Sequence, residues 1–96
     1  MKKNQNGRRY YDAEDHVIIT ALLMLKPRWS QEFLTQALDV DRTTVSNIKS
    51  KAIRLGLMDE KRIPTADGLE YLEWADTQYD IFAIVKKLNQ FSAEIL

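Results

Sequence analysis

The sequence predicts a single, mainly α-helical domain in which three short helices precede a β-hairpin and one long helix. Three observations support this fold class. Apolar residues recur at spacings of three and four in several segments, as on one face of a helix. Polar residues that commonly cap helices stand just before these segments. The chain of 96 residues is long enough for one modest core.

The N-terminal part is expected to be a basic arm followed by a core helix. Residues 1–11 lack apolar periodicity and carry four bases without an acid, which is typical of a flexible arm. Asp12 can cap a first helix, which runs to about Lys26 because Pro27 ends it. The dense apolar residues of this segment predict that it lies at the centre of the core.

The second and third helices follow at once. Ser30 can cap a helix from Gln31 to Leu38, and Asp41 can cap the next one. Gly56 is placed to end that third helix in a left-handed conformation. At about 100° per residue, one face of the third helix is apolar and should point at the core. That face consists of Val45, Ile48, Ala52 and Leu55.

The next segment is expected to be a hairpin. Two short extended pieces, residues 57–59 and 63–65, flank the charged turn Glu60-Lys61-Arg62. Pro64 suits an edge or terminal position of such a hairpin, because it cannot donate a ladder hydrogen bond.

A last helix can begin after Thr65 and continue towards the C-terminus. Its distal half carries an apolar stripe too wide to stay exposed in a monomer, so we expect this half to mediate dimerisation. A break between residues 77 and 80 would also let part of it pack on its own core. The expected dimer residues are Tyr79, Phe82, Val85, Leu88 and Phe91.

The side chains on the outward face of the third helix indicate nucleic-acid binding. Small hydroxyl side chains and an amide allow the helix to approach the edges of nucleobases closely. The Lys and Arg side chains beside them can contact phosphates. No acid occurs between Asp41 and Asp59, whereas a merely solvated helix more often carries Glu/Lys pairs. The expected base-facing residues are Thr43, Ser46, Asn47 and Ser50. The expected phosphate contacts are Arg42, Lys49, Lys51 and Arg54, with Lys61 and Arg62 on the hairpin.

The stretch QEFLTQALDVDRTTVSNIKSKAIRLGLMDEKRIPTADGLEYL resembles the winged helix-turn-helix domains of bacterial and phage transcription regulators, including MarR-like proteins. DRTTVSNI is similar to the opening of many recognition helices, and RLGLMDEKRIPTADGLEYL to a recognition-helix end, wing and following helix. The tight-turn position usually given to glycine is Asp39. The resemblance covers roughly residues 30–72 and, together with the first helix, implies a winged helix-turn-helix domain over residues 12–72. The apolar stripe described above makes residues 73–96 the expected dimerisation helix.

The function that this resemblance implies is double-stranded DNA binding by a homodimer, as a transcriptional repressor of phage, plasmid or bacterial type. Two alternatives stay open. One is DNA binding in partition or replication without transcription control. The other is a winged helix that binds only protein, with the acidic C-terminal helix as its docking surface.

The amino-acid composition bears on the other possible functions, namely metal binding, catalysis and effector binding. The chain has no cysteine, which excludes disulfides and thiolate metal sites and fits a reducing cytoplasm. Its single histidine, His16, lacks the partners that a metal or catalytic site would need, and no serine has a general base that could activate it as a nucleophile. We therefore expect no enzyme, metal, cofactor or membrane span. The aromatics Trp29, Tyr71, Trp74 and Tyr79 are more often core than effector pocket, so we expect no small-molecule effector.

Overall fold

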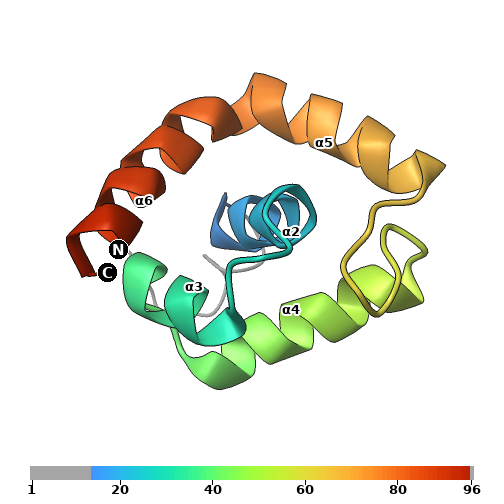
Figure 1. Ribbon diagram of the computed structural model, residues 1–96. Helices are drawn as coiled ribbons and strands as arrows, with labels where there is room; N and C mark the ends of the chain where they lie inside the picture. Colours follow the sequence, from blue (N-terminus) through green and yellow to red (C-terminus); the bar gives the residue numbers. More distant parts are fainter. Residues whose placement is uncertain (1–13, 96) are drawn as a thin grey trace, which may run out of the picture.

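The computed structural model describes the backbone of residues 14–95 and the side chains of residues 14–90 (Figure 1). The expected basic arm and the Asp12 cap lie outside these residues. Within the described part the fold is helical and contains no β-strand. Its helices are α2 (His16–Leu25), α3 (Gln31–Leu38), α4 (Arg42–Arg54), α5 (Ala66–Tyr79) and α6 (Ile81–Ile95).

Helix α2 lies at the centre, and the other four helices run around it (Figure 1). It packs against α4 on one side and against α5 and α6 on the other. Every residue from Ile19 to Met24 is buried, which agrees with the expected central core helix. The core therefore extends over all sides of α2, as a helix that is apolar all round requires.

Local capping explains where two of the surrounding helices begin. The Ser30 hydroxyl accepts a hydrogen bond from the Phe33 amide at 2.9 Å, and the Thr65 hydroxyl accepts one from Gly68 at 3.1 Å. Both satisfy amides that a helix start leaves without a partner. Asp41 occupies the cap position of α4 but makes no side-chain cap hydrogen bond.

The turns between helices use the left-handed conformation. Asp39 has φ 56° and ψ 51° at the end of α3, and Gly56 has φ 79° after α4. Aspartate adopts this region more readily than most residues other than glycine. The tight turn between α3 and α4 is thus formed with Asp39, and the left-handed ending at Gly56 is confirmed.

The expected β-hairpin is not seen. Between α4 and α5 the chain forms a compact turn with one isolated antiparallel bridge, Met58 to Pro64. The Asp59 carboxylate accepts from the amides of Lys61 and Ile63, so these amides are used within the turn. Arg62, in the charged turn, has φ 69°, a left-handed conformation that occurs in tight turns. The Asp59 amide donates to the Ile63 carbonyl and the Thr65 amide to the Leu57 carbonyl, both at 3.0 Å, but the pairing stops at this one bridge and forms no strand.

The long C-terminal helix is broken at Asp80, which has φ 50°. The break falls within the expected interval, and after it α6 packs against both α5 and α2 (Figure 1). Of the residues expected to mediate dimerisation, Leu88 is only 7% exposed and packs in the core of its own chain. Tyr79 and Val85 also pack on this core, whereas Phe82 is 67% exposed. The side chain of Phe91 lies outside the described residues.

These contacts place the C-terminal helices in the same core as the rest of the chain. Helix α5 runs across residues 72 and 73, where the resemblance implies a boundary between two units. Its own Ala75 is completely buried. None of the helices within residues 14–95 is long and apolar enough to cross a bilayer.

Candidate nucleic-acid interface

Helices α3 and α4 pack against each other and are joined by residues 39–41. The inner face of α4 is fixed by Val45, Ile48 and Ala52, all of which are buried. The fourth residue expected there, Leu55, follows the helix and is 61% exposed. It lies at the turn to Gly56, where the chain leaves the helical path, so the helical period no longer gives its direction.

The opposite face of α4 is open to solvent. All four residues expected to face bases are exposed on it, and their side chains are short. With the inner face held in the core, the rotation of α4 about its own axis is fixed by packing. The exposed face therefore presents hydroxyl and amide groups on a rigid helix. These residues are Thr43, Ser46, Asn47 and Ser50.

Cations lie at both ends of this face, and α4 contains no acid. Lys51 and Arg54 are exposed in its last turn, and Lys49 is half-buried. Arg42 at the start of α4 pairs with Glu32 of α3 at 3.3 Å. Both side chains of this pair are largely exposed, so it holds Arg42 only weakly. Arg42 therefore lies at the N-terminal end of the exposed face, and Lys51 and Arg54 lie at its C-terminal end.

The two bases of the turn before α5 have different surroundings. Lys61 is exposed. Arg62 is only 7% exposed, and its guanidinium points away from solvent into the C-terminal end of α2. This placement does not fit the expected role of Arg62 as a phosphate contact.

Arg62 instead holds three backbone carbonyls. Its Nε donates to Leu23 O at 2.9 Å, and its terminal nitrogens donate to Trp29 O at 2.7 Å and Lys26 O at 2.8 Å. Carbonyls at a helix end lack partners within the helix, so a cation there is favourable. Burial lowers the pKa of Arg62 below its ordinary value. Even so, an arginine keeps its proton in proteins.

The aromatic residues do not form one pocket. Trp29 stacks at a tilt on Phe33, with ring centroids 5.0 Å apart. Tyr71 and Trp74 meet edge to face on α5, at 5.6 Å. A separate cavity of about 430 Å³ lies between α2, α5 and α6, and none of the four aromatics named from the sequence lines it. Sequence periodicity identifies the apolar faces here but not the gap between them.

Side chains that could bind a metal ion do not gather in the described part of the chain. No group of three His, Cys, Asp or Glu side chains is placed there to hold a metal ion. His16 begins α2 and is half-buried, and its carbonyl accepts a hydrogen bond from the Thr20 hydroxyl at 2.8 Å.

Comparisons with protein-family models, with curated proteins and with solved structures gave no match to this chain.

Proposed function

We propose that the protein binds double-stranded DNA with α4 in the major groove and acts as a transcriptional repressor. The observation that carries the proposal is the contrast between the two faces of α4. One face is locked into the core, and the other offers Ser46, Asn47 and their neighbours with no acid among them. Hydroxyl and amide groups can read base edges, and the cations beside them can neutralise phosphates.

The proposal assigns separate roles to the residues of this interface. Thr43, Ser46, Asn47 and Ser50 face bases. Arg42, Lys49, Lys51 and Arg54 contact phosphates, and exposed Lys61 adds a contact from the following turn. Arg62 contacts no DNA in this proposal, because its donors already bind the carbonyls of Leu23, Lys26 and Trp29.

A homodimer is part of the proposal. Two linked copies of the chain would bind half-sites roughly 10 base pairs apart. Once one copy is bound, the second has a high effective concentration at its half-site, which raises the overall affinity. The buried position of Leu88 means that the full α6 stripe does not supply the contact. Sedimentation equilibrium of the intact chain, with and without a bound duplex, measures whether one or two copies bind.

Selection of bound sequences from a random duplex pool tests the proposal first. A groove reader should enrich a common sequence and should also bind random duplex at low salt. Absence of binding to any duplex at low salt would contradict DNA binding and favour the protein-interaction alternative. Enrichment of a sequence does not separate a repressor from a partition protein, so transcription from a promoter carrying the selected site is measured next.

Replacement of Asn47 or Ser46 by Ala tests the assigned face. Both side chains are exposed, so the fold should stay intact by circular dichroism. We expect each change to reduce discrimination between selected and random duplex by about 1–3 kcal/mol if the side chain reads a base. Asn89→Ala is the matched control, because Asn89 is an exposed asparagine on α6. An equal loss of affinity for both duplexes would show that Asn47 or Ser46 contacts the DNA backbone and not a base.

A further inference from the structure

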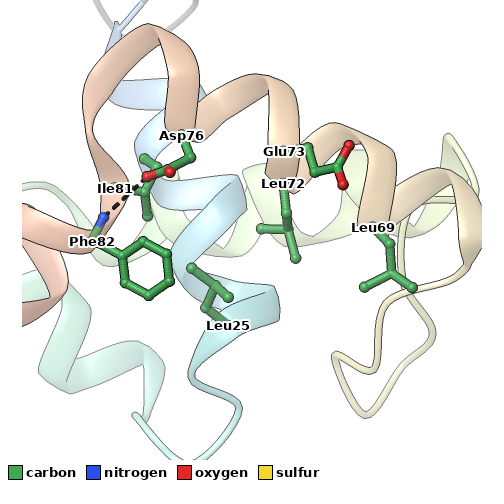
Figure 2. Close-up of a pocket in the computed structure, with 7 residues that line it drawn as sticks. All are labelled: Leu25, Leu69, Leu72, Glu73, Asp76, Ile81 and Phe82. Carbon is green, nitrogen blue, oxygen red and sulfur yellow. Dashed lines mark hydrogen bonds between the residues drawn. The ribbon is translucent and has the colours of Figure 1, made fainter.

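A cavity of about 430 Å³ is lined by residues of α2, α5 and α6 (Figure 2). Helices α5 and α4 lie on opposite sides of α2 (Figure 1). Figure 2 shows Leu69 and Leu72 projecting from α5, the Phe82 ring from α6, and Leu25 of α2 facing them. Its lining is completed by Ile81, Glu73 and Asp76. Five of these seven residues are apolar, and the two that are not are both acids.

The apolar residues of this cavity are poorly covered. Phe82 is 67% exposed, Leu69 56% and Leu25 38%, although all three belong to helices whose other faces reach the core. Large apolar side chains gathered around one hollow mark a binding site more often than scattered single residues do. A ligand here would remove three such side chains from water at once.

The polar part of the lining has one sign of charge. Glu73 lies at the rim beside the two leucines of α5, and its carboxylate has no ion pair or side-chain hydrogen bond within the described residues (Figure 2). The Asp76 carboxylate accepts from the Phe82 amide at 3.2 Å, which holds it at the start of α6. Residues 66–85 contain no base; their acids are Asp67, Glu70, Glu73, Asp76 and Asp80.

We propose that this cavity binds a small organic ligand with an apolar body and a cationic group, such as an aliphatic amine. The volume lies within the range of small-molecule sites, which are mostly apolar with a few polar groups that orient the ligand. The apolar body would lie against Phe82 and Leu69, and the cation would lie beside Glu73. The proposal does not depend on DNA binding, because the cavity is lined by residues of α2, α5 and α6 and not by those of α4.

The charge of the cavity favours a cationic ligand over a second copy of the chain. A symmetric pair formed through the same cavity would bring the acids of both rims together, and like charges in proximity oppose association. A cationic ligand instead meets unpaired Glu73 with the opposite charge. An anionic ligand of equal length would face both Glu73 and Asp76.

Three probes of equal chain length test the proposal: n-octylamine, 1-octanol and octanoate. Each is titrated into the intact, isotopically labelled protein at neutral pH, and the amide resonances of Leu69, Glu73 and Phe82 are followed. We expect saturable shifts at these amides, with octylamine bound about two- to fivefold more tightly than octanol, as one exposed ion pair allows. Octanoate should bind more weakly than octanol.

Two variants and a control assign the contacts. Glu73→Gln keeps the shape of the side chain and should bring the affinity for octylamine down to that for octanol. Glu60→Gln is the matched control, since it removes the same charge from an exposed residue that does not line the cavity. Phe82→Ala should lower the affinity for all three probes by the same factor, because the ring contributes apolar area and no charge.

The proposal is overturned if no probe gives saturable shifts at the cavity, or if octanoate binds as tightly as octylamine. It is also overturned if Glu73→Gln and Glu60→Gln have equal effects, since the preference would then come from net charge alone. Shifts at the same amides on simple dilution, without a probe, would show that a second copy occupies the cavity.

Discussion

At the scale of single residues, the guanidinium of Arg62 ties the C-terminal end of α2 to the turn that follows α4. Its three donors serve three carbonyls between residues 23 and 29. Its own backbone sits at φ 69°, a conformation that is unfavourable for residues other than glycine. The hydrogen bonds offset this local strain, so one residue both stores strain and joins two parts of the fold.

Arg62→Ala should therefore be strongly destabilising. The change removes three hydrogen bonds from a charged donor, although the Lys26 carbonyl still accepts from the Trp29 amide. We expect a decrease of about 2–4 kcal/mol in the free energy of unfolding. Arg62→Gly loses the same hydrogen bonds but removes the strain of the left-handed backbone. It should therefore be less destabilising than Arg62→Ala by about 1 kcal/mol. Urea unfolding followed by circular dichroism measures both. The control Lys61→Ala, at the exposed neighbour, should change stability by less than about 0.5 kcal/mol.

A loss of DNA affinity without a loss of stability in Arg62→Ala would contradict this account. It would mean that the guanidinium leaves α2 to meet a phosphate.

Leu88 and Phe82 lie on the same helix but face different surroundings. Leu88 is 7% exposed, and we expect Leu88→Ala to lower the free energy of unfolding by about 2–5 kcal/mol. Phe82 is 67% exposed, so Phe82→Ala should change it by less than about 0.5 kcal/mol. Chemical unfolding at two protein concentrations measures both effects. A Leu88→Ala variant that keeps its stability but loses self-association would show that α6 packs on a partner instead.

At the scale of elements, the turn of residues 55–65 is held closely against α5. The Thr65 hydroxyl donates to Gly56 O at 2.5 Å and accepts from the Gly68 amide. Gly68 is buried, and a Cβ atom added to it would collide with the backbone carbonyl of Leu57. Glycine is required at this position for the close approach of the two segments.

Gly68→Ala should consequently destabilise the protein. In an open helix this change stabilises by about 1 kcal/mol, but here the backbone must move, and we expect a net loss of about 1–3 kcal/mol. Gly56→Ala is the comparison, because a Cβ atom there meets nothing within 4 Å. Its expected loss, about 1 kcal/mol, comes from the left-handed φ alone. Thermal and urea unfolding measure both; a stabilised Gly68→Ala would refute the close packing.

Elements fixed by neighbouring residues could be predicted from the sequence. The starts of α3 and α5 follow from Ser30 and Thr65, whose hydroxyls act within three residues. The left-handed ending at Gly56 is equally local. The exposed polar face of α4 follows from helical period once its apolar face is known.

Elements that depend on distant parts of the chain could not be predicted. Arg62 binds carbonyls 33 to 39 positions away, and nothing near it in sequence marks that role. The apolar stripe of α6 is visible in the sequence, but periodicity does not tell whether a partner or the chain itself covers it. In the structure the chain itself covers part of it, because α6 packs against α2 and α5 after the break at Asp80 and Leu88 is buried in the core. The cavity between three helices is likewise a property of their packing.

At the scale of the whole molecule, a net charge of zero conceals two oppositely charged regions. Residues 41–65 carry six bases against three acids, and residues 66–85 carry five acids and no base. Helices α4 and α5 lie on opposite sides of α2, so the two charges face different directions (Figure 1). The proposed DNA would meet the basic side with the acidic side turned away, which fixes the orientation of approach.

This arrangement predicts that affinity for DNA depends on where a charge lies and not on the total charge. Lys51→Gln combined with Arg54→Gln removes two exposed cations from α4. For each phosphate that is no longer neutralised, the slope of log affinity against log salt should become shallower by about 0.9. Lys86→Gln combined with Lys87→Gln is the matched control, because both lysines are exposed on α6 and the change in net charge is the same.

Fluorescence anisotropy of a labelled duplex at several salt concentrations measures the slope for both double variants. We expect the α4 pair to lower it by about 1.8 and the α6 pair to leave it nearly unchanged, since α6 packs on α2 and α5. Unfolding of each variant is measured in parallel, and neither should lose stability because all four side chains are exposed. Equal slopes for the two variants would mean that DNA responds to net charge alone, and α4 would then have no special place in binding.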